Sequence, residues 1–294
     1  MEERDCPICG ESCVTSRGLG RRGGRAHHAR AGVETAVVRC RSCHGVYQLP
    51  TALPEGNPYL EQPAEGYFQH HDRERKVAAG ESLAHAAEGM LGARGRLLEI
   101  GCGRGELLRG AANAGWRVAG VDMTEPFAAD ARSLGFEIEV APAASAEALE
   151  RTWDVILLAA ILEHVYDPVD LLRRVARALR PGGVVLLDVP NECSLYTYLG
   201  NLYRRLRGTD WAVNLSPTFP PFHVVGFCPS SLRLALDRAG LVPVSLRQYR
   251  MVSTFTPVRR GALASLETLG LEAALTVGRL VGMGAGLECW ARKP

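Results

Sequence analysis

The sequence predicts an α/β protein: a Rossmann-like, seven-stranded and mostly parallel sheet with helices on both faces, plus a small N-terminal zinc ribbon. Three observations support this prediction. From residue 96 onward, short apolar runs alternate with helical segments, which is typical of a parallel sheet with crossover helices. A glycine-rich turn at 101–105 directly follows the first apolar run. Two Cys-x-x-Cys pairs occupy the first 50 residues and suit a tetrahedral metal site.

The predicted strands are continuous runs of Val, Ile and Leu, the composition of strands buried on both faces. The clearest are RLLEIG from residue 96, RVAGVD from 117, WDVILLA from 153 and VVLLDVP from 184, and FEIEVA from 136 is a weaker one. Proline begins, and glycine ends, the helices between these strands. The residues concerned are Pro126, Pro168, Gly115, Gly135 and Gly182.

The remaining elements are less regular. Helices are expected near 74–91, 193–207 and 229–239, and strands at LVPVSLRQY from 241 and GLECWARK from 286. The stretch 261–287 is rich in Ala, Leu, Gly and Val, but charged residues interrupt it, and it contains no apolar run of the roughly 20 residues that a membrane span needs. We expect a buried or half-buried helix there and no membrane span, with contact to a membrane surface as the alternative.

Composition excludes several classes of protein. The chain has 294 residues and a net charge of +2, so it lacks the strong basic field of a typical nucleic-acid-binding domain. Its nine cysteines form no even framework, which argues against a secreted disulfide scaffold. The N-terminus, MEERDCPICG, has no apolar run behind basic residues, so it is not a signal peptide. A cytoplasmic location is expected.

The glycine-rich turn indicates the type of ligand. Its spacing is GxGxG, and Glu106 stands where a third Rossmann glycine would fall; a carboxylate there disfavours a pyrophosphate, which speaks against a nicotinamide-dependent oxidoreductase. Asp122 ends the next strand and can accept hydrogen bonds from ribose hydroxyls. Glu99 adds negative charge beside the turn. Together they suit a nucleoside that carries a cation and no phosphate.

These segments resemble the motifs of class I S-adenosylmethionine (SAM)-dependent methyltransferases. LLEIGCGRG from 97 resembles the first motif, and the family's order continues through Asp122, the strand at 153–158, LEHV from 162, RPGG from 180 and PPFHVVGF from 220. The resemblance covers roughly 90–250 and implies SAM as cofactor. The cofactor-binding residues that it implies are Glu99, Gly101, Gly103, Gly105, Asp122 and Met123.

One segment departs from the family's pattern. After the third strand the family usually has an acidic or polar pair near the adenine, whereas this chain reads VAPAAS at 140–145. No adenine-contacting residue is therefore assigned. The alternative interpretation of the glycine-rich turn is a tight turn without a ligand, and that of Asp122 is a solvated acid at a strand end.

The two Cys-x-x-Cys pairs predict a structural zinc site, because four thiolates close a tetrahedral shell and leave no position for water. The predicted ligands are Cys6, Cys9, Cys40 and Cys43. The gap between the pairs is long and contains an Arg/Gly-rich insert at 16–32, expected to be a mobile loop because it has no apolar periodicity. Cys13 and His44 are alternative donors, and four unliganded thiols are the alternative to a metal.

Methyl transfer from SAM depends mostly on placing the acceptor close to the methyl group, and a base is needed only if the acceptor must lose a proton. His164, after the fourth strand, and His223, in the predicted lid, are the candidate catalytic residues. A hydrogen-bonded structural role is the alternative for each. Tyr59 and Tyr67 are candidates to close over SAM, with simple packing as the alternative.

The methyl acceptor is expected to be a small molecule. AAILEH replaces the Asn/Asp-Pro-Pro-Tyr element of enzymes that methylate nucleic-acid bases and amides, which favours an O or C atom of a sugar, polyketide or quinone-like compound. The alternatives are an RNA methyltransferase that grips RNA with its ribbon and basic insert, and a non-catalytic zinc-ribbon scaffold. The expected organisation is a zinc-ribbon-like module at 1–50, a connector and cap helix at 51–92, and the methyltransferase domain at 93–294, with a substrate lid at 190–230.

Overall fold

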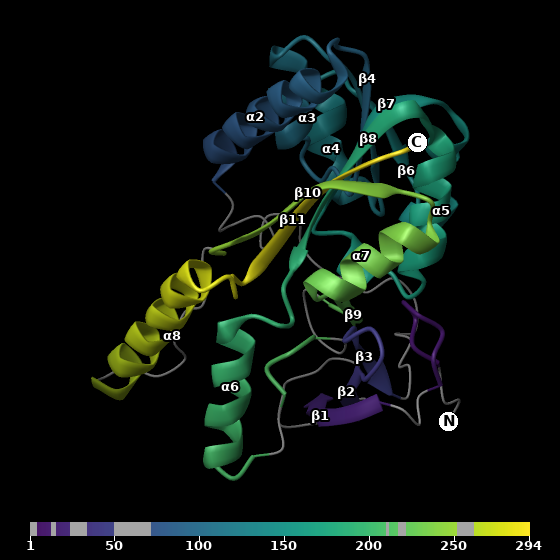
Figure 1. Cartoon of the computed structure of the whole chain (residues 1–294). Helices are drawn as coiled ribbons and strands as arrows, with labels where there is room; N and C mark the ends of the chain where they lie inside the picture. Colours follow the sequence, from purple (N-terminus) through teal and green to yellow (C-terminus); the bar gives the residue numbers. More distant parts are fainter. Residues whose placement is uncertain are drawn as a thin grey trace.

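A computed structural model describes residues 5–12, 16–23, 34–49, 72–209, 212–216, 222–251 and 262–294. Its main feature is a seven-stranded sheet with the order β10-β11-β8-β7-β4-β5-β6 (Figure 1). Within it, β11 alone runs antiparallel to its neighbours, β8 and β10. The predicted α/β fold with a mostly parallel sheet is confirmed. The strands are β4 (Arg96–Ile100), β5 (Arg117–Asp122), β6 (Glu137–Val140), β7 (Trp153–Ala159), β8 (Leu179–Pro190), β10 (Val242–Tyr249) and β11 (Gly286–Arg292).

Helices cover both faces of this sheet because its strands are apolar on both sides. Leu97 of β4 packs toward the layer of α2, α3 and α4, whereas its neighbour Leu98 packs toward the layer of α5 and α7. The alternation follows from the two-residue period of a strand. The helices are α2 (Arg73–Leu91), α3 (Glu106–Asn113), α4 (Glu125–Ser133), α5 (Pro168–Ala178) and α7 (Pro229–Arg238).

Two glycines let α2 and α3 approach each other closely. A Cβ on Gly80 would lie 2.3 Å from the carbonyl oxygen of Leu107, and one on Gly110 would lie 2.1 Å from the carbonyl oxygen of Val77. Contacts that short are impossible for a side-chain carbon, so both positions require glycine. The predicted helix near 74–91 is thereby held directly over the helix that follows the glycine-rich turn.

The turn before the fifth core strand differs from the prediction. RPGG at 180–183 was expected to separate helix from strand, but β8 already begins at Leu179, which pairs with Trp153. Gly182 N–H donates to the Lys293 carbonyl at 3.0 Å, and its φ is +75°. Backbone pairing with both neighbours thus extends the strand through the turn sequence.

The N-terminal part forms a second, four-stranded sheet in the order β1-β2-β3-β9. The expectation of a loop over the Arg/Gly-rich insert is wrong for 16–23: these residues form β1, which pairs antiparallel with β2 from Ser16↔Cys40 to Gly23↔Glu34. Ladder hydrogen bonds use backbone groups alone, so the missing apolar pattern does not prevent pairing. The strands are β1 (Ser16–Gly23), β2 (Glu34–Cys40), β3 (Val46–Leu49) and β9 (Val225–Gly226).

This smaller sheet is continuous with the rest of the protein. Its last strand, β9, comes from the segment before α7 and pairs with β3. Arg238 of α7 donates to the Ile8 carbonyl at 2.8 Å, and Ser230 donates to the Cys43 carbonyl at 3.1 Å. Ile8 and Tyr47 belong to the same apolar cluster as the main sheet. The cysteine-bearing region therefore shares its core with the main sheet.

A disulfide joins Cys193, after β8, to Cys228, which caps α7. Arg39 of β2 lies beside it: one guanidinium nitrogen is 2.6 Å from Cys193 Sγ, and another donates to the Glu192 carbonyl at 3.0 Å. The sequence does not predict this disulfide, because the two cysteines lie 35 residues apart without any spacing motif. The bond fastens both flanks of the predicted lid.

Two further helices, α6 (Leu195–Leu206) and α8 (Ala262–Leu280), contact each other away from the sheet (Figure 1). Both were predicted, and α8 is half-buried: Ala274 and Leu275 are buried, whereas Leu269 and Leu280 are exposed. Among the described residues, no helix combines the length and apolar character that crossing a bilayer requires.

Candidate functional site

The turn between β4 and α3 lies at the carboxyl edge of the sheet, where open α/β sheets bind ligands. Gly101, Gly103 and Gly105 all have positive φ, between 50° and 76°, a backbone conformation that residues with a side chain rarely adopt. A Cβ on Gly101 would also lie 2.0 Å from Ile161 Cδ1, and one on Gly105 2.8 Å from Ala131 Cβ. The backbone conformation thus accounts for all three predicted glycines.

Asp122 connects this turn to the end of β5. Its Oδ2 accepts from the Gly103 N–H at 2.8 Å and its Oδ1 from the Thr124 N–H at 3.2 Å. Burial raises the pKa of Asp122, while these backbone donors oppose the rise. A carboxylate has about four acceptor positions, so positions remain for two hydroxyl groups. Met123 follows, 40% exposed, beside the same turn.

Glu99 is buried just before the turn, and its Oε2 accepts no hydrogen bond within the described part of the chain. Burial raises its pKa well above the usual range, and Lys76 opposes that rise. An unpaired buried carboxylate oxygen is costly, and a cationic ligand would satisfy it. The other acid, Glu106, is paired with Arg104 through a hydrogen bond of 2.7 Å. The residues present therefore fit a nucleoside with a cationic tail.

The two predicted catalytic histidines lie close together after the carboxyl end of β7. His164, in the turn after β7, and His223, before β9, have ring centroids 4.9 Å apart. Glu163 joins them, with its Oε1 3.8 Å from His223 Nε2, and its carbonyl accepts from the Val224 N–H at 2.9 Å. Sequence reasoning named both histidines but missed Glu163, whose role depends on a residue 60 positions later.

Two members of this cluster, Glu163 and His223, are held without charge. Glu163 is 1% exposed, and within the described residues neither of its carboxylate oxygens accepts a hydrogen bond. Burial raises the pKa of Glu163 to about 8, with smaller contributions from Asp188 and Glu192. Burial and the nearby His164 lower the pKa of His223 to about 3. At neutral pH, the acid is therefore protonated and the His223 imidazole is neutral.

Asp188 and Tyr249 extend the cluster to β8 and β10. The Tyr249 hydroxyl donates to Asp188 Oδ1 at 2.7 Å, and burial raises the pKa of Asp188 to about 6. Sequence reasoning missed both, although Asp188 follows a buried apolar run just as Asp122 does. Asp122 and Asp188 thus lie at or near the carboxyl ends of two parallel strands, β5 and β8.

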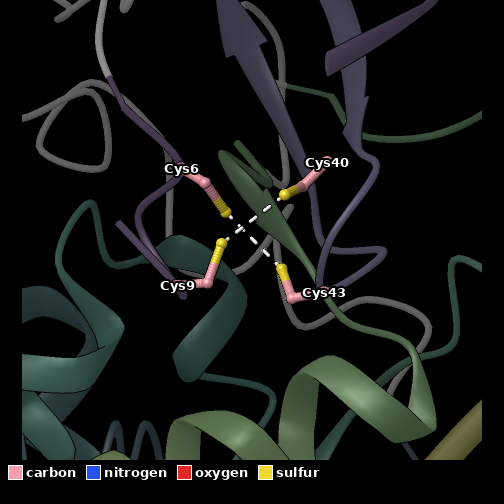
Figure 2. Close-up of side chains that lie close together, drawn as sticks. All are labelled: Cys6, Cys9, Cys40 and Cys43. Carbon is pink, nitrogen blue, oxygen red and sulfur yellow. Dashed lines mark hydrogen bonds between the residues drawn. The ribbon is translucent and has the colours of Figure 1, made fainter. Parts of the chain in front are cut away.

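The four predicted zinc ligands converge on one point (Figure 2). Cys6 Sγ lies 3.6 Å from Cys43 Sγ, and Cys9 Sγ lies 3.5 Å from Cys40 Sγ. Tetrahedral zinc with Zn–S bonds of about 2.3 Å needs sulfurs about 3.8 Å apart, so the donor set fits that ion. The alternative donor His44 instead lies in the turn after Cys43 with a φ of +66°, and Cys13 lies outside the described residues.

The predicted lid is described in part. His223 and Ser216 pair through two hydrogen bonds, from Ser216 N–H to the His223 carbonyl at 3.1 Å and from His223 N–H to Ser216 Oγ at 3.3 Å. Asn214 donates to the Glu192 carboxylate. These contacts hold the flank of the lid that carries His223. Tyr59, Tyr67 and 217–221 lie outside the described residues.

The sheet order and the site together define the methyltransferase class of α/β folds. Residues 68–246 match a family described as Methyltransferase domain, and the chain belongs to that family. Among solved structures, it is similar to a SAM-dependent methyltransferase from Archaeoglobus fulgidus, with a TM-score of 0.52, 19% identity, and coverage of 81% of this chain and 100% of that one. The plantazolicin methyltransferase BpumL in complex with SAH gives a TM-score of 0.52 at 16% identity, with 81% of this chain and 91% of that one covered. At these identities the likeness concerns the fold.

Curated relatives are ubiquinone biosynthesis O-methyltransferases. The one from Hydrogenovibrio crunogenus is 29% identical over 152 residues, which cover 49% of this chain and 61% of the relative. The one from Alkalilimnicola ehrlichii is 32% identical over 151 residues, covering 46% and 61%. The match thus spans about 61% of the length of these relatives.

Proposed function

We propose that this protein is a SAM-dependent O-methyltransferase acting on a hydroxyl group of a quinone-like small molecule. The observation that carries the proposal lies at the carboxyl ends of β4 and β5. There Asp122 accepts a hydrogen bond from the glycine-rich turn, and Oε2 of the buried Glu99 accepts no hydrogen bond among the described residues. SAM, when bound, supplies a methyl group activated by its sulfonium. Catalysis then requires an oriented acceptor and the exclusion of water.

Asp122, Glu99 and Met123 would hold the cofactor. Asp122 keeps acceptor positions for the ribose hydroxyls, and its two backbone donors fix its orientation. The positive charge of bound SAM would favour the ionised form of Glu99 over the protonated form that burial favours. Glu99 would then balance that charge in a site where burial strengthens electrostatic attraction. Met123 offers an exposed apolar surface beside the turn, suited to a nucleoside ring. The three glycines would let the backbone approach the ligand.

His164 is the better placed of the two histidines to accept a proton from the acceptor hydroxyl. Its Nδ1 lies 3.4 Å from the Phe222 carbonyl. A proton on Nδ1 would point to that oxygen and leave Nε2 as the acceptor. His223, whose pKa is lowered to about 3, is a weak base. We assign His223 and the protonated Glu163 to positioning and His164 to proton transfer.

The choice of an oxygen acceptor is supported by the relatives, whose names specify O-methylation in ubiquinone biosynthesis. A phenolic hydroxyl next to a neutral histidine can lose its proton as the methyl group arrives. A sugar hydroxyl or a carbon acceptor would need the same base, so the acceptor class has to be tested with compounds.

Zinc, held by the four cysteines, would serve a structural role. Four thiolates leave no coordination position for a substrate. The ion would fasten the loop at Cys6 and Cys9 to the end of β2 and the turn after it, and β3 in turn pairs with β9 beside His223. Its free energy of binding would thereby stabilise one wall of the acceptor site.

Calorimetric titration of chelator-free protein with SAM tests the proposal, with NADH as the control ligand. We expect micromolar affinity for SAM and none for NADH. Turnover is then followed by mass spectrometry with catechols and hydroquinones that carry apolar side chains, against simple sugars. The absence of SAM binding, or methylation of sugars alone, would contradict the proposal.

A further inference from the structure

Helix α6 presents small and polar side chains to the rest of the protein. Thr197 Oγ1 donates to the Glu192 carbonyl at 3.1 Å, and Asn201 Oδ1 accepts from the Val213 N–H at 2.8 Å. Gly200 packs between them, where a Cβ would lie 2.9 Å from Val213. Residues spaced three or four apart share one helix face. The face that fastens α6 to the protein is therefore not apolar.

The opposite face of α6 carries its apolar side chains. Leu199, Leu202 and Leu206 follow at helical spacing and are 40%, 43% and 79% exposed, and Tyr198 and Tyr203 flank them at 65% and 43%. A helix on a soluble protein normally turns such a stripe toward the core. The amphipathic pattern of α6 is inverted, so its apolar stripe faces outward.

Helix α8 has an exposed apolar stripe of its own. Leu269, Val277 and Leu280 are exposed on the side opposite the buried Ala274 and Leu275. The two helices are joined where Leu195 N–H donates to the Met283 carbonyl at 3.0 Å, and Figure 1 shows them projecting together from the sheet. Of the fourteen large hydrophobic residues exposed in the described part of the chain, nine lie on α6, on α8 or directly after α8. Such concentration marks an interaction surface.

Charge indicates the partner of this surface. Arg204, Arg205 and Arg207 are exposed at the end of α6, and 195–209 contain no Asp or Glu. A bilayer with anionic headgroups complements arginine and tyrosine at its interface and leucine just below. Helix α8 carries Glu267 and Glu272, and Glu272 pairs with Arg250, so the cationic part of the surface is the end of α6. A second copy of this chain would bring the same arginines to this part of the surface. The helices do not span a membrane, so they would lie in its plane.

We infer that α6 and α8 form a membrane-docking surface that seats the protein on an anionic lipid bilayer. The leucine stripe enters the headgroup region, and the three arginines bind lipid phosphates. This inference goes beyond the proposed function and does not depend on the acceptor. Because α6 follows directly after β8, docking places the carboxyl edge of the sheet near the bilayer surface.

Flotation of the full-length protein with vesicles tests the inference. Vesicles of equal parts phosphatidylglycerol and phosphatidylcholine are compared with pure phosphatidylcholine. We expect wild-type protein to float with the anionic vesicles and the pair Leu202→Glu and Leu206→Glu to lose at least tenfold in binding. The matched control is Leu134→Glu, at the end of α4, a leucine about as exposed as Leu202.

The arginines are tested separately. Each basic residue near an anionic surface strengthens binding roughly fivefold, so replacing Arg204, Arg205 and Arg207 by Gln should weaken it about a hundredfold. The control replaces Arg73, Arg94 and Arg151, all exposed elsewhere, and should bind as wild type does.

Two outcomes would overturn the inference: wild-type protein that does not float with anionic vesicles, or a dimer in light scattering that the leucine pair dissociates without any vesicle binding. Thermal melting of every variant shows that it is folded. Protein that binds vesicles but not SAM would leave this inference standing and contradict the proposed function, so the two failures are distinguishable.

Discussion

Asp122 Oδ2 accepts a hydrogen bond from the Gly103 N–H at 2.8 Å. The bond joins the end of β5 to the glycine-rich turn after β4, and both oxygens of the carboxylate are oriented by backbone donors. A ligand whose ribose hydroxyls donate to Asp122 therefore also requires the glycine-rich turn to keep its present conformation.

Replacing Asp122 by Ala should weaken SAM binding at least tenfold. The change removes the ribose acceptor and leaves the buried N–H groups of Gly103 and Thr124 unsatisfied, which costs about 1–3 kcal/mol for each group. Calorimetry measures the affinity and thermal melting the stability. Asp130→Ala, an exposed acid on α4, is the control. Unchanged affinity in the Asp122 variant would remove this residue from the cofactor site.

His164→Ala should lower kcat by about 10²–10⁴, the usual contribution of a general base, without changing SAM affinity. His223→Ala should mainly raise KM, because that residue positions the acceptor. His85→Ala, on the exposed surface of α2, is the control for both. Equal loss of SAM affinity and turnover would show that the histidines support the fold and not the chemistry.

Glu163 should make stability fall as the pH rises from 6.5 to 8. Its folded pKa, about 8, lies above the usual 4.5, so the folded state holds the proton more tightly and loses stability between those values. Burial lowers the folded pKa of His223 from 6.5 to about 3 and raises that of Asp188 to about 6. Above pH 6.5, the end of the unfolded-state titration of His223 raises stability slightly and the end of the folded-state titration of Asp188 lowers it slightly, so the two contributions largely offset each other. The expected loss is about 2 kcal/mol, measured by denaturant unfolding. Glu163→Gln should remove this loss from the slope, and an unchanged slope would assign it to another buried acid such as Glu99, whose pKa burial also raises.

Cys40→Ser should lower bound zinc from one ion per chain to well below that and reduce the melting temperature. The thiolate set would lose one of its four members, and a serine hydroxyl is a poor zinc ligand at neutral pH. Cys289→Ser, at a buried cysteine of β11 far from the cluster, is the control and should keep its zinc. Metal analysis that finds a full ion in the Cys40 variant would refute the ligand assignment.

A reductant should destabilise the protein by opening the Cys193–Cys228 bond. For a loop of 35 residues, the chain-entropy treatment gives about 4 kcal/mol. The variant with both cysteines changed to serine should melt lower than wild type and show no response to the reductant. Alkylation under denaturing conditions should label two cysteines fewer before reduction than after. Equal labelling would mean that the bond is absent.

The parallel sheet could be predicted because each strand can be recognised from its own residues. Runs such as WDVILLA are apolar, short and bounded by turn residues. The same rule failed for β1, where SRGLGRRG carries no apolar pattern and only the backbone of β2 defines the strand. RPGG resembles a turn in isolation, yet the carbonyl of Lys293, more than 100 residues later, makes it part of β8.

The site divides in the same way. The glycines and Asp122 were predictable because a strand, a turn and the next strand end lie close in sequence. Glu163 and the Asp188–Tyr249 pair depend on contacts between residues about 60 positions apart, which one sequence does not reveal. Burial, which sets the pKa values of Glu163 and His223, is likewise a property of the assembled fold.

The pairing of Val46 with Gly226 also bears on the order of events during synthesis. β1, β2 and β3 leave the ribosome first, but β3 can pair with β9 at the sheet edge only after most of the main sheet has emerged. A long loop must close before that pairing forms, and its entropy is lost before any contact compensates. Metal capture by the cysteines can begin early, but the N-terminal sheet is completed late, and with it the wall of the site that carries His223.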